Sequence, residues 1–348
     1  MENKMIESKS IILGAPENFS IADKISFKLS CLGFDVQECM VSPQPFQYKN
    51  IGQRLYNLYR KVVFNDYEHK KQLKAEANKQ YYLDKINTFK KADYALIIRP
   101  DLYPEDVLLE MRKKVDLMVA YQWDGFDRFP NVKELVPVFD RFYVFDPADL
   151  KYEGVLPTTN FYLESRFGTD CSKNKVFYVG SYDEARWEIT CELLASFADI
   201  DINKEILLFP NKGKIRAITE EYKEVSLLDT TIPYRETLNK VKDSSVLLDL
   251  QNPIHKGLSF RVFEGLGFNK KVITTNPAVE KYDFYNPNNI LIWENQHKNE
   301  VLDFINSPYE EVPSFIREKY SFENWIKYVL NIEKHTPIQT QAMQMAEA

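Results

Sequence analysis

The sequence predicts an α/β protein with two domains, each a parallel β-sheet covered by helices. Three features predict this class. The chain has 348 residues, enough for two domains of ordinary size. Short apolar, β-rich runs alternate with helical patterns along both halves, as expected for parallel sheets. A less patterned stretch, residues 150–175, contains Gly, Pro, Ser and Thr and is predicted to be the linker between the halves.

The first half is predicted to contain five strands and two helical regions. The second region has no Pro and is rich in Lys, Gln, Leu and Tyr, so it is one long helix or a helix pair. The predicted strands are 10–16, 34–41, 94–99, 117–123 and 141–145, and the predicted helical regions are 21–32 and 51–89.

The second half repeats the alternation. Its predicted strands are 176–181, 205–210, 245–250, 271–276 and 289–295, and its predicted helices are 185–197, 234–242, 259–267 and 321–332. Ser321 is a suitable N-cap for the last helix. We therefore expect one domain over 1–168, a second over 169–332 and a flexible tail over 333–348.

Charge and hydropathy exclude several classes of protein. The chain has 45 Lys and Arg against 51 Asp and Glu, a net charge of −6, which argues against nucleic-acid binding. No run approaches the length of a membrane span, and the first ten residues lack the apolar core of a secretory signal. We therefore expect a cytoplasmic protein.

One segment is basic against this acidic background. Residues 49–91 contain eleven Lys or Arg and four Asp or Glu, a local charge of +7. This segment is either a solvated helical face or a docking surface for anionic lipid or an anionic acceptor at the inner face of the membrane.

The cysteines and the acidic triplets give no sign of a metal. Cys31, Cys39, Cys171 and Cys191 form neither a C-x-x-C pair nor a zinc-ligand pattern, so we expect buried free thiols. The Asp-Ile-Asp triplet at 199–201 lies between a predicted helix and a predicted strand and is interpreted as a capping turn. No bound metal or cofactor is expected.

Ligands of open α/β sheets bind beyond the carboxyl ends of the strands. The strongest candidate follows strand 245–250, where a turn through Gly257 leads into a helix that starts near Ser259. Backbone N–H groups there can hold a diphosphate, and Lys256 and Arg261 can add charged contacts. Glu264 can accept hydrogen bonds from ribose hydroxyls. Alternatively, Ser259 only caps the helix, and Arg261 and Glu264 form a surface ion pair.

A second candidate is the turn at Gly180 and Ser181, where strand 176–181 meets a helix. Such a turn can hold a phosphate or a sugar, but it is also a common connector. A G-x-G-x-x-G dinucleotide fingerprint is absent here and after Leu13, which argues against a dehydrogenase. His255 lies close to the predicted phosphate loop and could contact a donor or leaving group.

The third candidate follows strand 117–123. Trp123 offers a flat apolar surface for a sugar ring, and Arg128 a polar contact on the acceptor side. Asp124 could act as a general base toward an acceptor hydroxyl, with Asp127 as the next residue to test. The alternative is that the aromatic residues are core and Asp124 caps the following turn.

These blocks, in this order, resemble bacterial glycosyltransferases of lipopolysaccharide, O-antigen and capsule loci that have two Rossmann-like domains facing a central cleft, the GT-B architecture. The resemblance covers roughly residues 94–292. It is carried by YQWDGFDRFP (121–130), FDRFYVFDPADL (139–150), VFYVGSYDEAR (176–186), the block 244–276 and YDFYNPNNILI (282–292).

The resemblance implies that the second domain binds a nucleotide-activated sugar through Ser259, Arg261 and Glu264, and that the first binds a glycan or lipid-linked acceptor near Asp124. It also implies catalysis without a metal. The Glu-x7-Glu pattern of several retaining families is not intact, because Gly257 stands seven residues before Glu264. Two alternatives stay open: a nucleotide-sugar epimerase of the same architecture, and a non-catalytic nucleotide-sugar-binding subunit.

Overall fold

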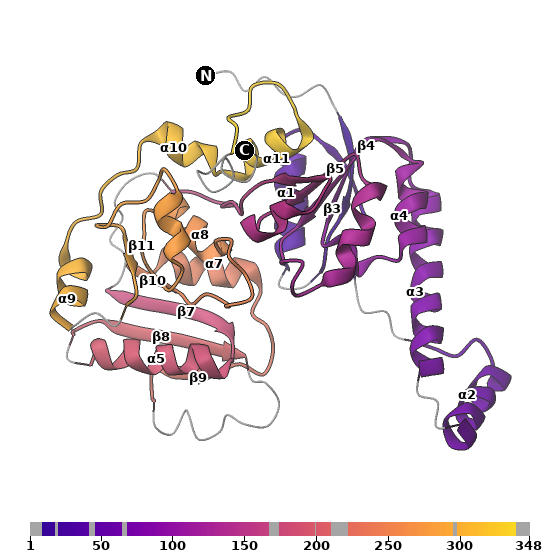
Figure 1. The fold of residues 1–348 in the computed structure, drawn as a ribbon, viewed down its shortest axis with the longest axis horizontal. Coiled ribbons are helices and arrows are strands. Elements are labelled where there is room, and N and C mark those ends of the chain that lie inside the picture. Colours follow the sequence, from indigo (N-terminus) through magenta and orange to yellow (C-terminus); the bar gives the residue numbers. More distant parts are fainter. Residues whose placement is uncertain are drawn as a thin grey trace.

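The computed structural model contains two parallel six-stranded sheets, each covered by helices (Figure 1). The part of the chain built on the first sheet is called the first domain below, and the part built on the second sheet the second domain. The structure describes residues 9–17, 20–41, 46–64, 68–166, 174–198, 200–209, 222–294 and 298–338.

The first sheet has the strand order β2-β1-β3-β4-β5-β6, and every pairing in it is parallel. Alternate residues of the inner strands point to opposite faces, so Leu96 packs toward α1 while Ile97 packs toward α3 and α4. The strands are β1 (Ser10–Gly14), β2 (Asp35–Glu38), β3 (Ala92–Ile98), β4 (Val115–Gln122), β5 (Arg141–Val144) and β6 (Val155–Pro157), and the helices are α1 (Ile21–Cys31), α2 (Ile51–Phe64), α3 (Glu68–Thr88) and α4 (Glu105–Arg112).

The second sheet has the order β12-β11-β10-β7-β8-β9 and is also parallel throughout. Helix α5 and helix α9 cover one face, and α7 and α8 cover the other. The strands are β7 (Lys175–Ser181), β8 (Asn203–Phe209), β9 (Val225–Leu227), β10 (Val246–Asp249), β11 (Lys271–Thr274) and β12 (Ile290–Ile292), and the helices are α5 (Glu184–Ser196), α7 (Tyr234–Lys242), α8 (Phe260–Phe268), α9 (Lys298–Asn306), α10 (Ser314–Lys319) and α11 (Phe322–Leu330).

Each strand and helix predicted above has a counterpart, and the region 51–89 is the helix pair α2 and α3. Within the described residues, four short 3₁₀ helices, two edge strands and three helices were not predicted. The 3₁₀ helices are η2 (Pro100–Leu102), η3 (Pro130–Val138), η4 (Pro147–Lys151) and η5 (Pro277–Lys281), and the other unpredicted elements are β6, β9, α4, α9 and α10.

The prediction of a linker over 150–175 was wrong for its first part. That part contains the edge strand β6 and continues as buried chain through Leu163. Its buried Asn160 side chain is hydrogen-bonded on both sides: it accepts from the Tyr121 hydroxyl at 2.6 Å and donates to the Leu258 carbonyl at 2.8 Å.

Two further predictions concern the cysteines and the tail. Cys31 and Cys39 are free thiols, but only Cys39 is buried, so the expectation that Cys31 is buried was wrong. Cys171, Asp199 and residues 339–348 lie outside the described residues. The domain limits at 168 and 332 stay predictions.

Helix α11 follows the second sheet in the sequence but packs against the first. The Trp325 ring contacts Tyr121 and Phe161, with centroids 4.9 and 4.4 Å away, and its Nε1–H donates to the Thr159 carbonyl at 3.0 Å. The aromatic core that it joins continues from one domain into the other. Trp325 therefore ties the end of the described chain to the first domain.

The chain passes between the domains at two neighbouring places. Tyr162 lies on the first passage, between β6 and β7. Tyr320 lies on the second, between α10 and α11, and Phe322 is the first residue of α11. The Tyr162 N–H donates to the Tyr320 carbonyl at 3.1 Å, and the Phe322 N–H donates to the Tyr162 carbonyl at 2.9 Å. The two passages are therefore paired side by side as parallel chain.

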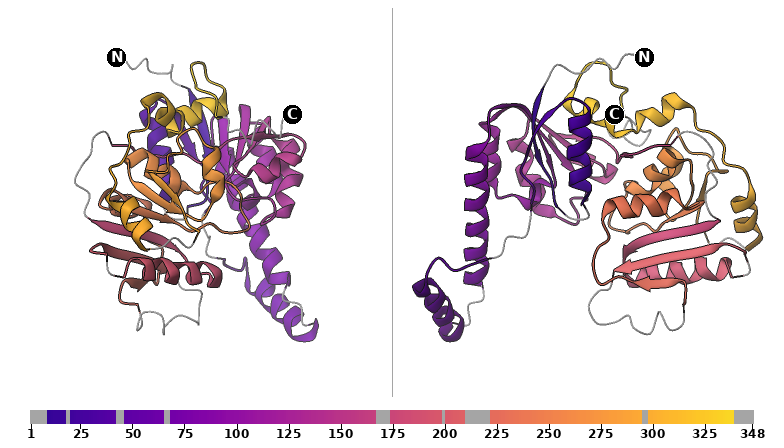
Figure 2. Two further views of the ribbon diagram at one scale, coloured as in Figure 1. Left: turned by 60° about the vertical axis from the view of Figure 1, so that its left-hand side comes forward. Right: turned by 180° about the vertical axis from the view of Figure 1, so that it is seen from behind.

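Helices α2 and α3 form an arm that extends beyond the first domain (Figures 1 and 2). The C-terminal half of α3 packs on the domain through Tyr82 and Ile86. Both additional views show α2 at the far end of the arm, away from the end of the molecule that holds α11.

We predict that Trp325→Ala lowers the free energy of unfolding by about 3–5 kcal/mol, because it leaves a cavity in the shared core and removes a buried hydrogen bond. Urea unfolding followed by circular dichroism measures this. Phe315→Ala is the matched control, because Phe315 is 71% exposed on α10. An equal effect of both variants would contradict the structural role of Trp325.

Candidate functional site

A cavity of about 400 Å³ lies between the two domains at the carboxyl ends of their strands. Strands β4 and β7 both end at its wall, as the geometry of parallel sheets requires. The first domain contributes Trp123 and Asp124, and the second contributes Gly180, Ser181, Tyr234, Arg261 and Glu264. Side chains predicted for the donor and for the acceptor thus line one cavity.

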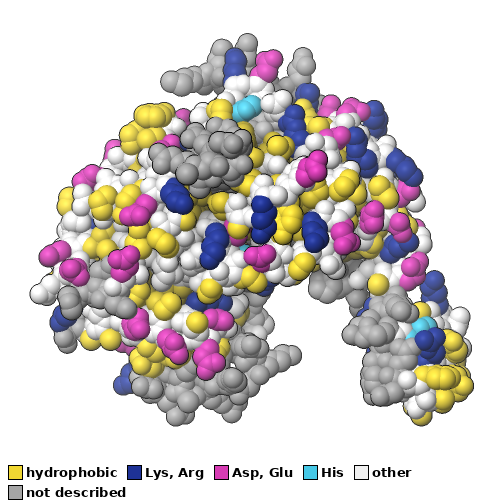
Figure 3. All heavy atoms as spheres, viewed as in Figure 1, with side chains coloured by type: hydrophobic (Ala, Val, Ile, Leu, Met, Phe, Trp, Pro, Cys, Tyr) yellow, Lys and Arg dark blue, Asp and Glu magenta, His cyan; other side chains and the backbone are white. Residues whose placement is uncertain are grey.

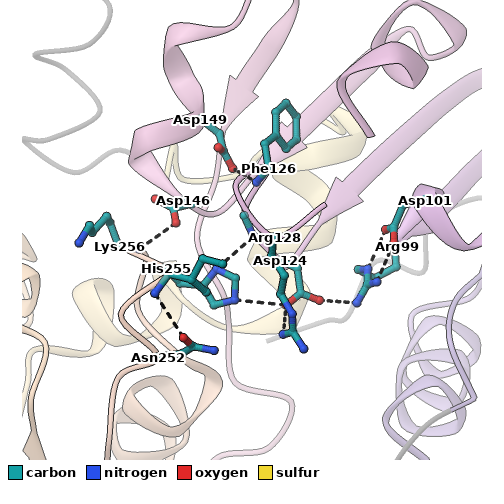
Figure 4. A network of polar contacts seen from close by, with 12 residues as sticks. Arg99, Asp101, Asp124, Phe126, Arg128, Asp146, Asp149, Asn252, His255 and Lys256 are labelled. Atoms are coloured by element: carbon teal, nitrogen blue, oxygen red, sulfur yellow. Dashed lines mark hydrogen bonds and ion pairs between the residues drawn. The ribbon is translucent and has the colours of Figure 1, made fainter. Parts of the chain in front are cut away.

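The Asp124 carboxylate is buried at the end of β4, among cationic groups (Figure 4). Arg99 Nη1 contacts one carboxylate oxygen, and Arg128 Nη1 is 2.8 Å from the other. Burial alone would raise the pKa of Asp124, but the hydrogen bond from His255 and the charges of Arg99 and Arg128 outweigh it and lower the pKa. Asp124 is therefore held ionised.

Arg99 reaches Asp124 because of its backbone conformation. It is the first residue after β3 and has a φ of 60°, in the left-handed region that non-glycine residues seldom adopt. Its guanidinium binds Asp101 through two hydrogen bonds of 2.7 Å and stacks over the Phe129 ring at 4.1 Å. The sequence-based prediction missed Arg99, although its position at a strand end could have found it.

His255 brings the second domain to the same cluster. Its Nδ1 accepts a hydrogen bond from the Gly125 N–H at 3.2 Å, so the proton of the neutral ring lies on Nε2. That nitrogen is 3.3 Å from an Asp124 oxygen. The next residue in the loop, Lys256, donates its backbone N–H to Asp146 at 2.8 Å. The loop 252–257 is therefore fixed to the first domain at two points (Figure 4).

Gly257 and Lys256, both predicted for the donor site, lie in different surroundings: Gly257 lines the second cavity described below, and Lys256 does not. A Cβ on Gly257 would lie 2.5 Å from the Phe145 carbonyl oxygen, so this position excludes a side chain because the first domain passes beside it. The Lys256 side chain is exposed and points away from Asp124, and it lines neither this cavity nor the one described below.

Ser259 is the N-cap of α8. Its Oγ accepts from the Arg261 N–H at 3.1 Å and donates to the buried Asp249 at 2.7 Å. Arg261 Nη1 is 2.6 Å from Glu264 Oε2. Ser259 therefore caps the helix and Arg261 and Glu264 form an ion pair, as the alternative interpretation expected. The ion pair is not on the surface, because Glu264 is 2% exposed and lines the cavity. Burial raises the pKa of Glu264, and Arg261 opposes this.

A second cavity, of about 230 Å³, adjoins the first through Trp123 and Phe260, which line both. Arg186, Asp249, His255 and Ser259 also line it. Arg186 comes from α5, directly after the turn at Gly180 and Ser181, and adds a cation that the predicted site did not include.

The remaining acceptor-side residues lie further out. Asp127 is exposed and lines neither of these two cavities. Arg128 is half exposed and lines a third cavity, of about 390 Å³, together with Asp101, Phe129 and Glu134. Asp124 lines the first cavity and is bound by Arg128, which lines the third, outer cavity. Asp124 therefore lies between these two cavities.

No cluster of three His, Cys, Asp or Glu side chains suited to a metal ion occurs within the part of the chain that the structure describes. Among the described helices, none has both the length and the apolarity needed to cross a bilayer. Catalysis without a metal stays a prediction.

No protein-family model matches the sequence, and no curated protein is significantly similar to it. Solved structures do match. An alpha-glucosyltransferase in complex with UDP and a 13-mer DNA containing a central A:G mismatch has a TM-score of 0.53, with 12% sequence identity over 91% of this chain and 93% of that chain. The chain has the GT-B fold.

Two further solved structures are similar over most of the chain. The apo form of the lipopolysaccharide outer core galactosyltransferase WaaB matches 92% of this chain and 99% of its own, at 11% identity and a TM-score of 0.49. A UDP-N-acetylglucosamine 2-epimerase matches 96% of this chain and 100% of its own, at 10% identity and a TM-score of 0.49. The likeness establishes the fold alone, so the reaction must be argued from the site.

Asp149, on η4, fixes the loop that carries Asp124. Its carboxylate accepts from the Phe126 N–H at 3.0 Å. Burial raises the pKa of Asp149 from 3.8 to about 6, although the Phe126 hydrogen bond opposes this. The folded state therefore binds this proton more tightly than the unfolded state does. The resulting stabilisation is present at low pH and is lost as pH rises through about 4–6.

We predict that Asp149→Asn stabilises the protein more at about pH 7.5 than at about pH 4, since Asn keeps the acceptor and removes the buried charge. Urea midpoints of the variant and the wild type at both pH values test this. Asp140→Asn is the control, because Asp140 is exposed and stands immediately before β5. A larger gain at low pH would contradict the predicted direction.

Proposed function

We propose that this protein is a glycosyltransferase that moves a sugar from a nucleotide-activated donor to an acceptor hydroxyl. The observation that carries the proposal is the cavity in which Arg261 and Glu264 of the second domain lie opposite Trp123 and Asp124 of the first. A cleft between two Rossmann-like domains, lined by apolar surface and a few polar groups from both sides, suits two substrates that must meet.

The donor is assigned to the second domain. Its diphosphate would lie at the N-terminus of α8, where backbone N–H groups favour an anion. Among the described residues, the Arg261 guanidinium uses Nη1 for Glu264, so Nη2 and Nε remain for phosphate oxygens. Arg186 supplies a second cation from the adjoining cavity. The Glu264 carboxylate would accept from the ribose hydroxyls.

The acceptor is assigned to the first domain, with its reacting hydroxyl at Asp124. The hydroxyl oxygen bonds to the anomeric carbon, the bond from that carbon to the donor phosphate breaks, and Asp124 takes the hydroxyl proton. The low pKa keeps Asp124 ionised, so its carboxylate can accept a hydrogen bond from the acceptor hydroxyl. It also makes the orientation of that hydroxyl an important part of the role of Asp124. Trp123 offers its ring to the sugar. The outer cavity beside Arg128 would hold the rest of the acceptor.

The class of acceptor comes from the resemblance of the sequence. We propose a glycan or lipid-linked acceptor of lipopolysaccharide, O-antigen or capsule synthesis, used on the cytoplasmic side of the membrane. The DNA in the alpha-glucosyltransferase complex belongs to that protein. The net charge of −6 argues against a nucleic-acid acceptor for this chain.

We predict that Arg261→Ala weakens binding of a nucleoside diphosphate by about 1.5–3 kcal/mol, the usual contribution of a charged hydrogen bond. Calorimetric titration with uridine, guanosine and cytidine diphosphates measures the affinity. Arg112→Ala, which breaks a comparable ion pair with Asp140 far from the cavity, is the control. Unchanged affinity of Arg261→Ala for whichever nucleotide binds would remove Arg261 from the donor site.

We predict that Asp124→Asn lowers sugar transfer by about 10²-fold or more while donor affinity stays nearly unchanged, because Asn keeps most of the size but cannot take the proton. Asp140→Asn, an ion-paired Asp of the same domain, is the control. Transfer at the wild-type rate, or unfolding of Asp124→Asn, would make Asp124 a structural residue. Asp127→Asn would then be tested.

The same assay separates the alternatives. A donor incubated without acceptor should remain unchanged or be hydrolysed slowly. An epimerised free sugar nucleotide would replace the proposal by an epimerase. Donor binding with no turnover across glycan acceptors, and with no hydrolysis, would replace it by a binding subunit.

A further inference from the structure

Helix α2 exposes an apolar stripe that nothing in the described chain covers. Of the fourteen large hydrophobic side chains that are exposed among the described residues, eight lie on this one helix. Ile51, Leu55, Leu58 and Val62 follow the i, i+4, i+7, i+11 spacing of a single helical face. Ile51 is 78% exposed and Val62 is 72% exposed. The stripe is therefore concentrated at one place and not scattered over the surface.

The helix is held by polar contacts and not by an apolar core. Its single buried residue is Asn57, whose Nδ2 donates to the Tyr48 hydroxyl at 3.0 Å. At its start, the Gln53 N–H donates to Asn50 Oδ1 and the Lys49 N–H donates to Gln53 Oε1, both at 2.8 Å. Reciprocal capping of this kind stabilises the first turn locally. The apolar face is thus left for an external partner.

The charge of the helix indicates the chemistry of that partner. Helix α2 carries Arg54, Arg60 and Lys61 and has no acidic residue. Arg54 and Lys61 are exposed and, being seven positions apart, lie together along one edge of the stripe. The wider segment 49–91 has a net charge of +7 in a chain with a net charge of −6. An apolar stripe edged by cations fits an anionic lipid surface.

The position of α2 agrees with this chemistry. The helix lies at the tip of the arm, where apolar side chains form a patch next to Lys and Arg side chains (Figure 3). The arm places this patch away from the body of the molecule, as all three ribbon views show. The tip of the arm therefore presents α2 apart from the sheet of the first domain.

We infer that α2 docks the protein on an anionic bilayer by lying in the plane of the lipid interface. The apolar stripe enters the boundary between head groups and acyl chains, and Arg54 and Lys61 contact the anionic head groups. Fourteen residues make a helix of about 21 Å, shorter than the hydrocarbon core, so α2 lies on the membrane and does not cross it. The inference corresponds to the docking interpretation of segment 49–91.

A second copy of this chain is the other occupant to consider. Two α2 helices facing each other through the stripe would bring their cations together, with no acidic residue in either helix to neutralise them. A bilayer containing anionic lipid supplies that negative charge. The charge pattern therefore favours lipid.

The test is co-sedimentation of the full chain with vesicles of phosphatidylcholine alone and of phosphatidylcholine mixed with phosphatidylglycerol, without donor or acceptor. The wild type should bind the mixed vesicles, and added salt should weaken the binding. The double variant Leu55→Asn/Val62→Asn should bind at least about tenfold more weakly, because two apolar side chains no longer enter the interface. Neither residue is buried, so the fold should persist in circular dichroism.

The matched control is Leu109→Asn/Phe315→Asn, which removes two exposed apolar side chains from α4 and α10. It should bind like the wild type. Equal binding to neutral and mixed vesicles at low salt, or wild-type binding by the α2 variant, would overturn the inference. A dimer that forms without vesicles and is lost in the α2 variant would assign the stripe to a second copy. Because no transfer is measured, these outcomes are independent of the proposed reaction.

Discussion

A buried carboxylate must be compensated by positive charge or hydrogen bonds, and both domains contribute to this compensation at Asp124. Arg99 and Arg128 come from the first domain and His255 from the second. The same requirement fixes the loop after β4, the unusual backbone of Arg99 and the approach of the loop at 252–257. The electrostatics of this side chain therefore link the two domains at the proposed reaction centre.

The rule that ligands bind at the carboxyl ends of parallel strands explains why much of the site could be predicted. Trp123, Ser181 and Asp249 each stand at or just after the end of a strand recognisable from its apolar run, and all three line the two adjoining cavities. Helix α8 was also recognisable from its spacing and its cap. The strand ends and helix α8 were both recognisable from a few consecutive residues, so the sequence signal for them is local.

Features that depend on distant contacts could not be predicted in this way. Strand β6 has three residues and an edge position, so it carries no periodic signal. The Arg99–Asp124 pair joins residues 25 positions apart, and Gly257 is required by Phe145 of the other domain. Helix α11 was predicted as a helix, but its packing against the first sheet was not. That packing depends on the contacts of Trp325 with Tyr121 and Phe161, which are distant in the sequence.

The paired passages at Tyr162 and Phe322 make the connection between the domains a narrow double-stranded hinge. Two adjacent chains held together by peptide hydrogen bonds can bend or twist as a unit, but they resist sliding apart and independent swivelling. The aromatic core around Trp325 runs through both domains and adds to this connection. The two domains are therefore held in one alignment, in which Asp124 and His255 face each other across the cleft.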